Sequence, residues 1–70
     1  NFLHKLKEQH PELTAKDMRL AAYLRMNLSS KEIAPLMNIS VRSVEISRYR
    51  LRKKIALEHD QNLYDYLMTL

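Results

Sequence analysis

The stretch Ser40–Ile55, SVRSVEISRYRLRKKI, decides the fold. Placed on a helix at 100° per residue, Leu51 and Ile55 fall within about 20° of Val44 on either side, and the three residues form an apolar stripe. The opposite side consists of Arg42, Ile46, Tyr49, Arg50 and Lys53, with Ser43 and Glu45 at its margins. An ordinary solvated face mixes lysine with glutamate. A cationic face with an aromatic and an aliphatic side chain is typical of a helix that enters the DNA major groove.

Positive charge is concentrated in this segment. Residues 40–57 contain six basic residues and one acidic residue, a net charge of +5, whereas the whole chain has a net charge of +4. Such a concentration is expected of a surface that contacts phosphate groups. A solvated basic helix without a partner is the alternative, because basic runs are common.

The composition indicates one small domain of 70 residues whose core comes from helices packed on helices. The chain has no cysteine, which excludes disulfides and Cys-based zinc sites and favours a reducing compartment. It has no apolar run of about 20 residues, the length needed to span a bilayer. We therefore expect a cytoplasmic domain.

Helix starts are marked by one local pattern that occurs three times: Leu13-Thr14-x-x-Asp17-Met18, Leu28-Ser29-x-x-Glu32-Ile33 and Ile39-Ser40-x-x-Ser43-Val44. Each places a hydroxyl at the N-cap, a polar residue at the third helical position and an apolar pair around the cap. The third pattern lacks the acid and is the weakest. With a lead helix before Pro11 and a last helix capped by Asp60, the predicted helices are about 2–9, 15–26, 30–37, 41–57 and 60–69.

The turns between these helices lack glycine, so asparagine must supply positive φ, and Asn27 and Asn38 stand at the two places where it is needed. Pro35 lies inside the predicted helix 30–37, where we expect a kink or a 3₁₀ turn. In that helix Ile33, Ala34 and Leu36 are expected to be buried. The short turn before the basic helix predicts a helix-turn-helix.

Four segments in the same order resemble the LuxR/GerE-type helix-turn-helix: Leu13-Thr14-x-Lys16-Asp17, Leu28-Ser29-Ser30-Lys31-Glu32-Ile33-Ala34, Ile39-Ser40-Val41-Arg42-Ser43-Val44-Glu45 and Arg48-x-Arg50-Leu51-x-x-Lys54-Ile55. The resemblance covers about residues 13–57. It implies a four-helix DNA-binding domain, here residues 13–70, preceded by a linker or lead helix in residues 1–12. Glu45 and Ser47 stand where the family often has lysine and histidine, Asn27 replaces a glycine, and Ser43 replaces a threonine.

The resemblance also implies the C-terminal part of a bacterial transcription regulator, which usually dimerises on an inverted repeat. A separate receiver or ligand-sensing domain would then control it. The first residue is asparagine and not methionine, so we expect that upstream part to be missing from this chain. The full-length protein could be soluble or attached to a membrane.

Positions on the helix suggest how the DNA contacts divide. Contacts to base edges are expected from four residues of the N-terminal half: Arg42, Glu45, Ile46 and Tyr49. Contacts to phosphate are expected from five residues, two of them at the start of the preceding helix: Ser30, Lys31, Ser43, Arg50 and Lys53. Glu45 either accepts a hydrogen bond from a base or pairs with Arg42. Arg48 is expected to pair with an acid such as Glu32 or Asp17.

The last helix carries an apolar stripe at helical spacing, formed by Leu63, Leu67 and Leu70. The stripe either closes the small core or forms the seam of a homodimer.

Other classes of function are poorly supported. The three histidines are scattered, and neither a cysteine nucleophile nor a glycine-rich phosphate loop exists, so we expect no enzyme, no metal and no cofactor. A protein-interaction module that uses the basic and last helices, or a promoter-recognition domain like that of a sigma factor, are the alternatives to a regulator domain. A membrane-surface role would need the apolar positions that the core requires.

Overall fold

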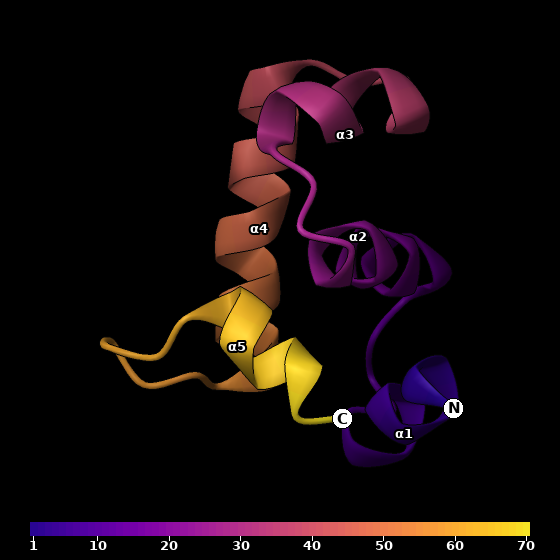
Figure 1. Cartoon of the computed structure of the whole chain (residues 1–70), viewed down its shortest axis with the longest axis vertical. Helices are drawn as coiled ribbons and strands as arrows, with labels where there is room; N and C mark the ends of the chain where they lie inside the picture. Colours follow the sequence, from indigo (N-terminus) through magenta and orange to yellow (C-terminus); the bar gives the residue numbers. More distant parts are fainter.

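The structure is all helical. The computed structural model describes residues 1–70 and contains α1 (Phe2–Gln9), α2 (Ala15–Arg25), α3 (Ser30–Met37), α4 (Val41–Ile55) and α5 (Leu63–Met68), with no strands. The long helix α4 runs along one side, α3 lies at its N-terminal end, and α1 lies at the opposite end of the molecule from α3 (Figure 1). α2 packs against α1, α4 and α5 and so lies in the middle. The predicted all-α class is confirmed, and no helix is long and apolar enough to cross a membrane.

The three predicted helix starts are confirmed. The Asp17 N–H donates to Thr14 Oγ1 over 3.1 Å, and the Thr14 N–H donates back to the Asp17 carboxylate over 3.0 Å. Ser29 and Glu32 form the same reciprocal pair, whose hydrogen bonds from Ser29 hold the pKa of Glu32 below its ordinary value. At α4 the Ser43 N–H donates to Ser40 Oγ over 3.0 Å without a carboxylate to return the bond. The third start is therefore the weakest, as its sequence indicates.

Three helices end in the same left-handed turn, with φ of 62° at Asn27, 56° at Asn38 and 62° at Ala56. In each case the next residue is apolar, packs against the core and donates its N–H to the carbonyl five residues earlier: Leu28 to Tyr23, Ile39 to Ala34, and Leu57 to Arg52. This is the Schellman motif, which satisfies carbonyls at a helix end. The two asparagine turns confirm the prediction. Ala56 was not expected in this role, and α4 ends at Ile55 where the sequence predicted residue 57.

Ala56 offers a direct test of this turn. Ala56→Gly is expected to raise the free energy of unfolding by about 0.5–1 kcal/mol, because glycine lacks the Cβ that makes positive φ unfavourable. The melting temperature should rise by several degrees. Ala22→Gly, inside α2, should lower it instead. A lower melting temperature in Ala56→Gly would contradict the left-handed turn.

The core consists of twelve buried residues, all hydrophobic: Leu6, Leu13, Leu20, Ala21, Leu24, Ile33, Ala34, Val44, Leu51, Ile55, Leu63 and Leu67. The apolar stripe of α4, Val44, Leu51 and Ile55, is buried as predicted. Leu6 is fully buried, so α1 contributes to the core itself and does more than cover it.

The last helix closes this core. Leu67 is 0 % exposed and Leu63 is 5 % exposed, and Leu70 is partly buried against them. Leu63 and Leu67 therefore cannot form a dimer seam, and that reading of the stripe is wrong for these two residues. A side chain that is covered by its own domain cannot also contact a second copy.

The start of α5 also differs from the prediction. Its N-cap is Asn62, whose Oδ1 accepts from the Asp65 N–H over 3.1 Å, and not Asp60. The residues before it form a loop that Arg52 holds from α4, donating to the carbonyl of Gln61 over 2.7 Å and to that of Glu58 over 3.1 Å. The helix is therefore limited to Leu63–Met68.

Pro35 causes no 3₁₀ turn, because α3 is α-helical from Ser30 to Met37. The Arg19 guanidinium donates to the Leu36 carbonyl over 2.7 Å and so satisfies one acceptor in the last turn. Leu36 itself is 47 % exposed, and its predicted burial is wrong. Ile33 and Ala34 anchor α3 in the core, and Met37 is partly buried against it.

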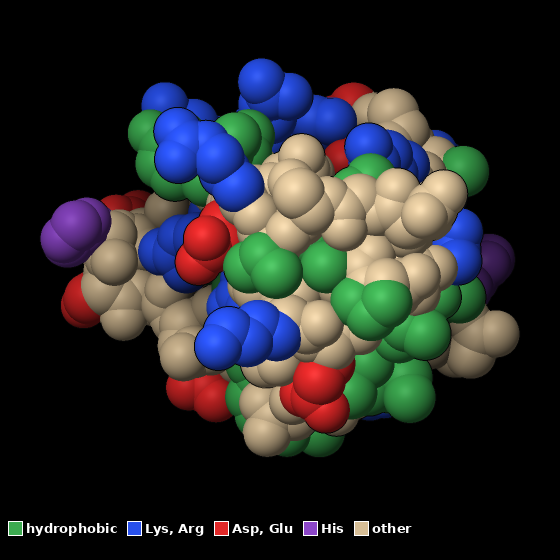
Figure 2. Space-filling view, turned by 90° about the horizontal axis from the view of Figure 1, so that it is seen from above, with side chains coloured by type: hydrophobic (Ala, Val, Ile, Leu, Met, Phe, Trp, Pro, Cys, Tyr) green, Lys and Arg blue, Asp and Glu red, His purple; other side chains and the backbone are tan.

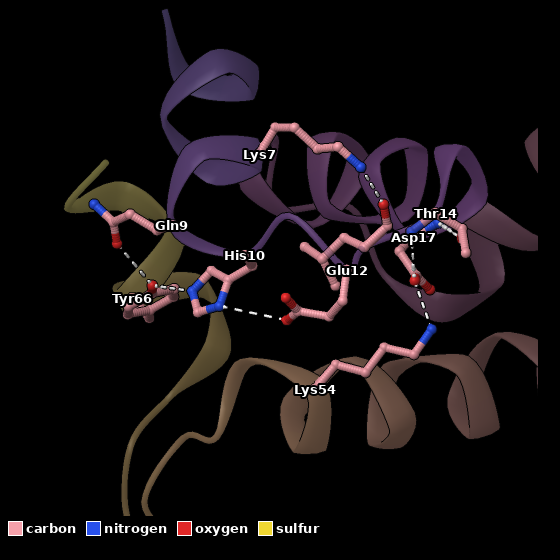
Figure 3. Close-up of polar contacts among 9 residues, drawn as sticks. Lys7, Gln9, His10, Glu12, Thr14, Asp17, Lys54 and Tyr66 are labelled. Carbon is pink, nitrogen blue, oxygen red and sulfur yellow. Dashed lines mark hydrogen bonds and ion pairs between the residues drawn. The ribbon is translucent and has the colours of Figure 1, made fainter.

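Polar contacts join α1 to α5 (Figure 3). His10 Nε2 lies 2.7 Å from the Tyr66 hydroxyl, which donates to Gln9 Oε1 over 3.3 Å. Burial raises the pKa of the Tyr66 phenol. The Arg25 guanidinium of α2 lies 4.7 Å from the centre of the Phe2 ring of α1. The N-terminal and C-terminal segments are thus fixed to each other.

Candidate nucleic-acid interface

The candidate interface is built by α3, the turn and α4. The left-handed Asn38 ends α3, and the hydroxyl of Ser40 caps α4 after Ile39, so the chain changes direction within three residues. Arg48 Nη1 then donates across the pair to Ser30 Oγ over 3.2 Å and ties α4 to the first residue of α3. The buried side of α4 faces the core, which leaves the opposite side free for a ligand.

The basic residues of α4 divide into two groups of three. Arg48, Arg52 and Lys54 are engaged within the domain, since Arg48 bonds Ser30, Arg52 bonds the loop before α5, and Lys54 pairs with Asp17 over 2.6 Å. Arg42, Arg50 and Lys53 are exposed and form no ion pair with an acid. The structural cations and the available cations are thus on different sides of one helix.

The pair between Lys54 and Asp17 joins α4 to the start of α2 (Figure 3). Burial acts to raise the pKa of Asp17, but hydrogen bonds from Lys54 and Thr14 outweigh it and hold the pKa below its ordinary value. Asp17 is therefore ionised at neutral pH, and its carboxylate is already bound by Lys54 and Thr14. Because Arg48 bonds the Ser30 hydroxyl, its expected partnership with Asp17 or Glu32 is wrong.

We call the free side of α4 the outward face, defined by six exposed residues: Arg42, Glu45, Ile46, Tyr49, Arg50 and Lys53. Tyr49 is 58 % exposed and Ile46 is 42 % exposed, although both are large hydrophobic residues. Lys53 Nζ lies 4.9 Å from the centre of the Tyr49 ring, a cation–π distance. The structure thus brings together on one helix face all four residues predicted to contact bases and two of those predicted to contact phosphate.

The other three predicted phosphate contacts lie at the helix starts. Lys31 is exposed on the first turn of α3, and Ser43 is exposed but its Oγ accepts from the Ser40 hydroxyl over 3.0 Å. Ser30 is partly buried, and its oxygen accepts from Arg48. Figure 2 views the molecule from the end that carries α3 and the first turns of α4, where Lys and Arg side chains gather around hydrophobic ones.

Glu45 is the acid on the outward face, and it is exposed. The ion pairs of the structure join His4 to Glu8, His10 to Glu12, and Lys54 to Asp17, and Glu45 belongs to none of them. The local pair with Arg42, left open by the sequence, is not formed.

Sequence reasoning missed the structural roles of Arg52 and Lys54, which hold α4 to the loop before α5 and to α2. Both belong to the basic run, but their partners are a loop carbonyl and an acid 37 residues away, and helical spacing alone contains no signal for either. No group of three or more His, Asp or Glu side chains is placed to hold a metal ion.

A cationic helix with an exposed face that follows a tight turn after a scaffold helix defines a helix-turn-helix DNA-binding domain. A sequence model described as "Bacterial regulatory proteins, luxR family" matches residues 11–67. The chain belongs to this family, and it is a DNA-binding domain of the kind found in bacterial transcription regulators. The resemblance noted in the sequence is confirmed.

One curated relative is the tetrathionate response regulatory protein TtrR of Salmonella typhimurium. It is 39 % identical over 46 residues, which cover 66 % of this chain and 22 % of TtrR. The chain thus spans about a fifth of the length of this relative. No solved structure matches the chain.

Proposed function

We propose that this domain binds double-stranded DNA sequence-specifically, with α4 as the recognition helix in the major groove, and that it regulates transcription. The observation that carries the proposal is the separation of cations on α4. Three basic residues stabilise the domain, while Arg42, Arg50 and Lys53 remain exposed beside Tyr49 and Ile46. A helix of this width and charge fits the major groove.

In this arrangement the N-terminal half of α4 reads base edges. Arg42 is suited to guanine, and Ile46 is suited to a thymine methyl group. Tyr49 follows on the same face, and Glu45 contacts a base from its margin.

Phosphate contacts fix the position of α4 in the groove. We assign them to Arg50 and Lys53 on α4, to Lys31 on α3, and to Ser30 and Ser43 at the two helix starts. Lys31 and Ser30 lie in the first turn of α3, where free N–H groups and the helix dipole also favour an anion. Ser30 can still donate its hydroxyl hydrogen, because it acts toward Arg48 as an acceptor.

We further propose that the domain is the output part of a signal-responsive regulator in a bacterial cytoplasm, with its sensory or receiver part elsewhere in the protein. The name of TtrR, a response regulatory protein, supports this proposal, as does the small share of its length that the chain spans. A homodimer through α5 would use the exposed side of that helix, where Met68 is 48 % exposed.

The test is enrichment of bound duplexes from a random-sequence pool by the 70-residue chain. The wild type should enrich a defined sequence, and Tyr49→Ala should bind it more weakly and select less strictly while keeping the helical circular dichroism of the wild type. Met26→Ala removes another exposed side chain, at the C-cap of α2 and outside the predicted DNA contacts, and should enrich the wild-type sequence. Binding to an acidic protein together with no measurable binding to duplex DNA would favour a protein-interaction module instead.

A further inference from the structure

The carboxylate of Glu45 forms no ion pair within the domain. Glu45 is the one acid between residues 40 and 57, and in the structure it is exposed and unpaired. The basic residues nearest along the helix are Arg42 and Arg48. Arg48 donates to Ser30, and Arg42 forms no ion pair.

A capping role does not account for Glu45 either. The free N–H groups at the start of α4 are served by Ser40, which accepts from Ser43. An acid interacts favourably with the helix dipole only in the first turn. Glu45 is the fifth residue of α4 and lies beyond that turn. The acid therefore weakens a cationic face without stabilising the fold.

The DNA major groove offers a carboxylate few suitable partners. Ionised glutamate only accepts hydrogen bonds, and phosphates repel it. The donors on base edges are N4 of cytosine and N6 of adenine. Adenine places the acceptor N7 beside N6, so it suits an amide side chain and repels a carboxylate, whereas cytosine presents its N4 donor alone.

We infer that Glu45 makes the domain selective for cytosine at one position of its binding sequence. The inference rests on the proposed function, and it adds the identity of one base.

The experiment first compares the wild type with Glu45→Gln and Glu45→Ala in the same enrichment, which identifies the base pair at which their preferences differ. Each protein is then bound to four duplexes of the wild-type sequence that differ only at this base pair. The wild type should bind the cytosine duplex about tenfold or more tightly than the others. Glu45→Gln should prefer adenine at that position, since an amide matches N6 and N7 together. Glu45→Ala should show no preference there. Circular dichroism serves as the control for folding.

Two results would overturn the inference by different routes. In the first, all three proteins prefer the same base at every position, or both variants merely bind every duplex more tightly. Glu45 would then act only by repelling phosphate, and the inference would fail although the domain binds DNA. If the wild type enriches no sequence, the proposed function fails and the inference fails with it.

Discussion

Leu67→Glu is expected to leave the domain unfolded at 25 °C. Leu67 is 0 % exposed, so the substitution removes a core leucine and places a carboxylate in a core whose buried residues are all hydrophobic. The two losses together are on the order of 5 kcal/mol or more. The whole stability of a domain of this size is about 4–10 kcal/mol. Circular dichroism should therefore lose most of its helical signal.

The control for this substitution is the next residue. Met68 lies on the same helix but is 48 % exposed, so Met68→Glu should keep the helical signal and change the melting temperature little. If α5 forms a dimer, sedimentation should show Met68→Glu as a folded monomer. A folded Leu67→Glu protein would contradict the burial of α5 in the core.

Arg50→Ala is expected to lower the salt dependence of DNA binding by about one unit. Each phosphate contact contributes about 0.9 to the slope of log affinity against log salt concentration, because the contact releases a condensed counterion. Arg50 is exposed and forms no ion pair, so its removal should leave the fold intact. The measurement is binding to a labelled duplex across a salt series.

Lys5→Ala provides the matched control. Lys5 is exposed on α1, at the opposite end of the molecule from α3, and its loss changes the net charge by the same amount (Figure 1). Its salt slope should stay close to that of the wild type. Equal slopes in the two variants would mean that net charge, and not a contact of Arg50, governs binding.

Local signals made three of the helix starts and two of the turns predictable. A cap needs only a hydroxyl and residues up to four positions away, and Thr14, Ser29 and Ser40 all act as predicted. Asn27 and Asn38 adopt the left-handed conformation because asparagine tolerates it without glycine. The buried stripe and the outward face of α4 were predictable for the same kind of reason, since helical spacing separates them.

Where the predictions were wrong, contacts between distant segments decided the outcome. Leu63 and Leu67 form a stripe that fits a core or a dimer equally well, and their burial depends on α2, which packs against α5. Leu36 continues the apolar pattern of α3 but is 47 % exposed, because no other segment covers it fully. Ala56 adopts the left-handed conformation, which ends α4 and lets Leu57 pack against the core.

The sequence by itself determined that there are five helices, the N-caps of α2, α3 and α4, and a basic helix with one face in the core and one exposed face. The tertiary structure alone decided which cations of that helix remain available. Arg48, Arg52 and Lys54 have the composition of a DNA-binding run, yet their partners are Ser30, a loop and Asp17. Spacing along one helix gives the direction of a side chain, but a hydrogen bond to another segment depends on where the fold places that segment.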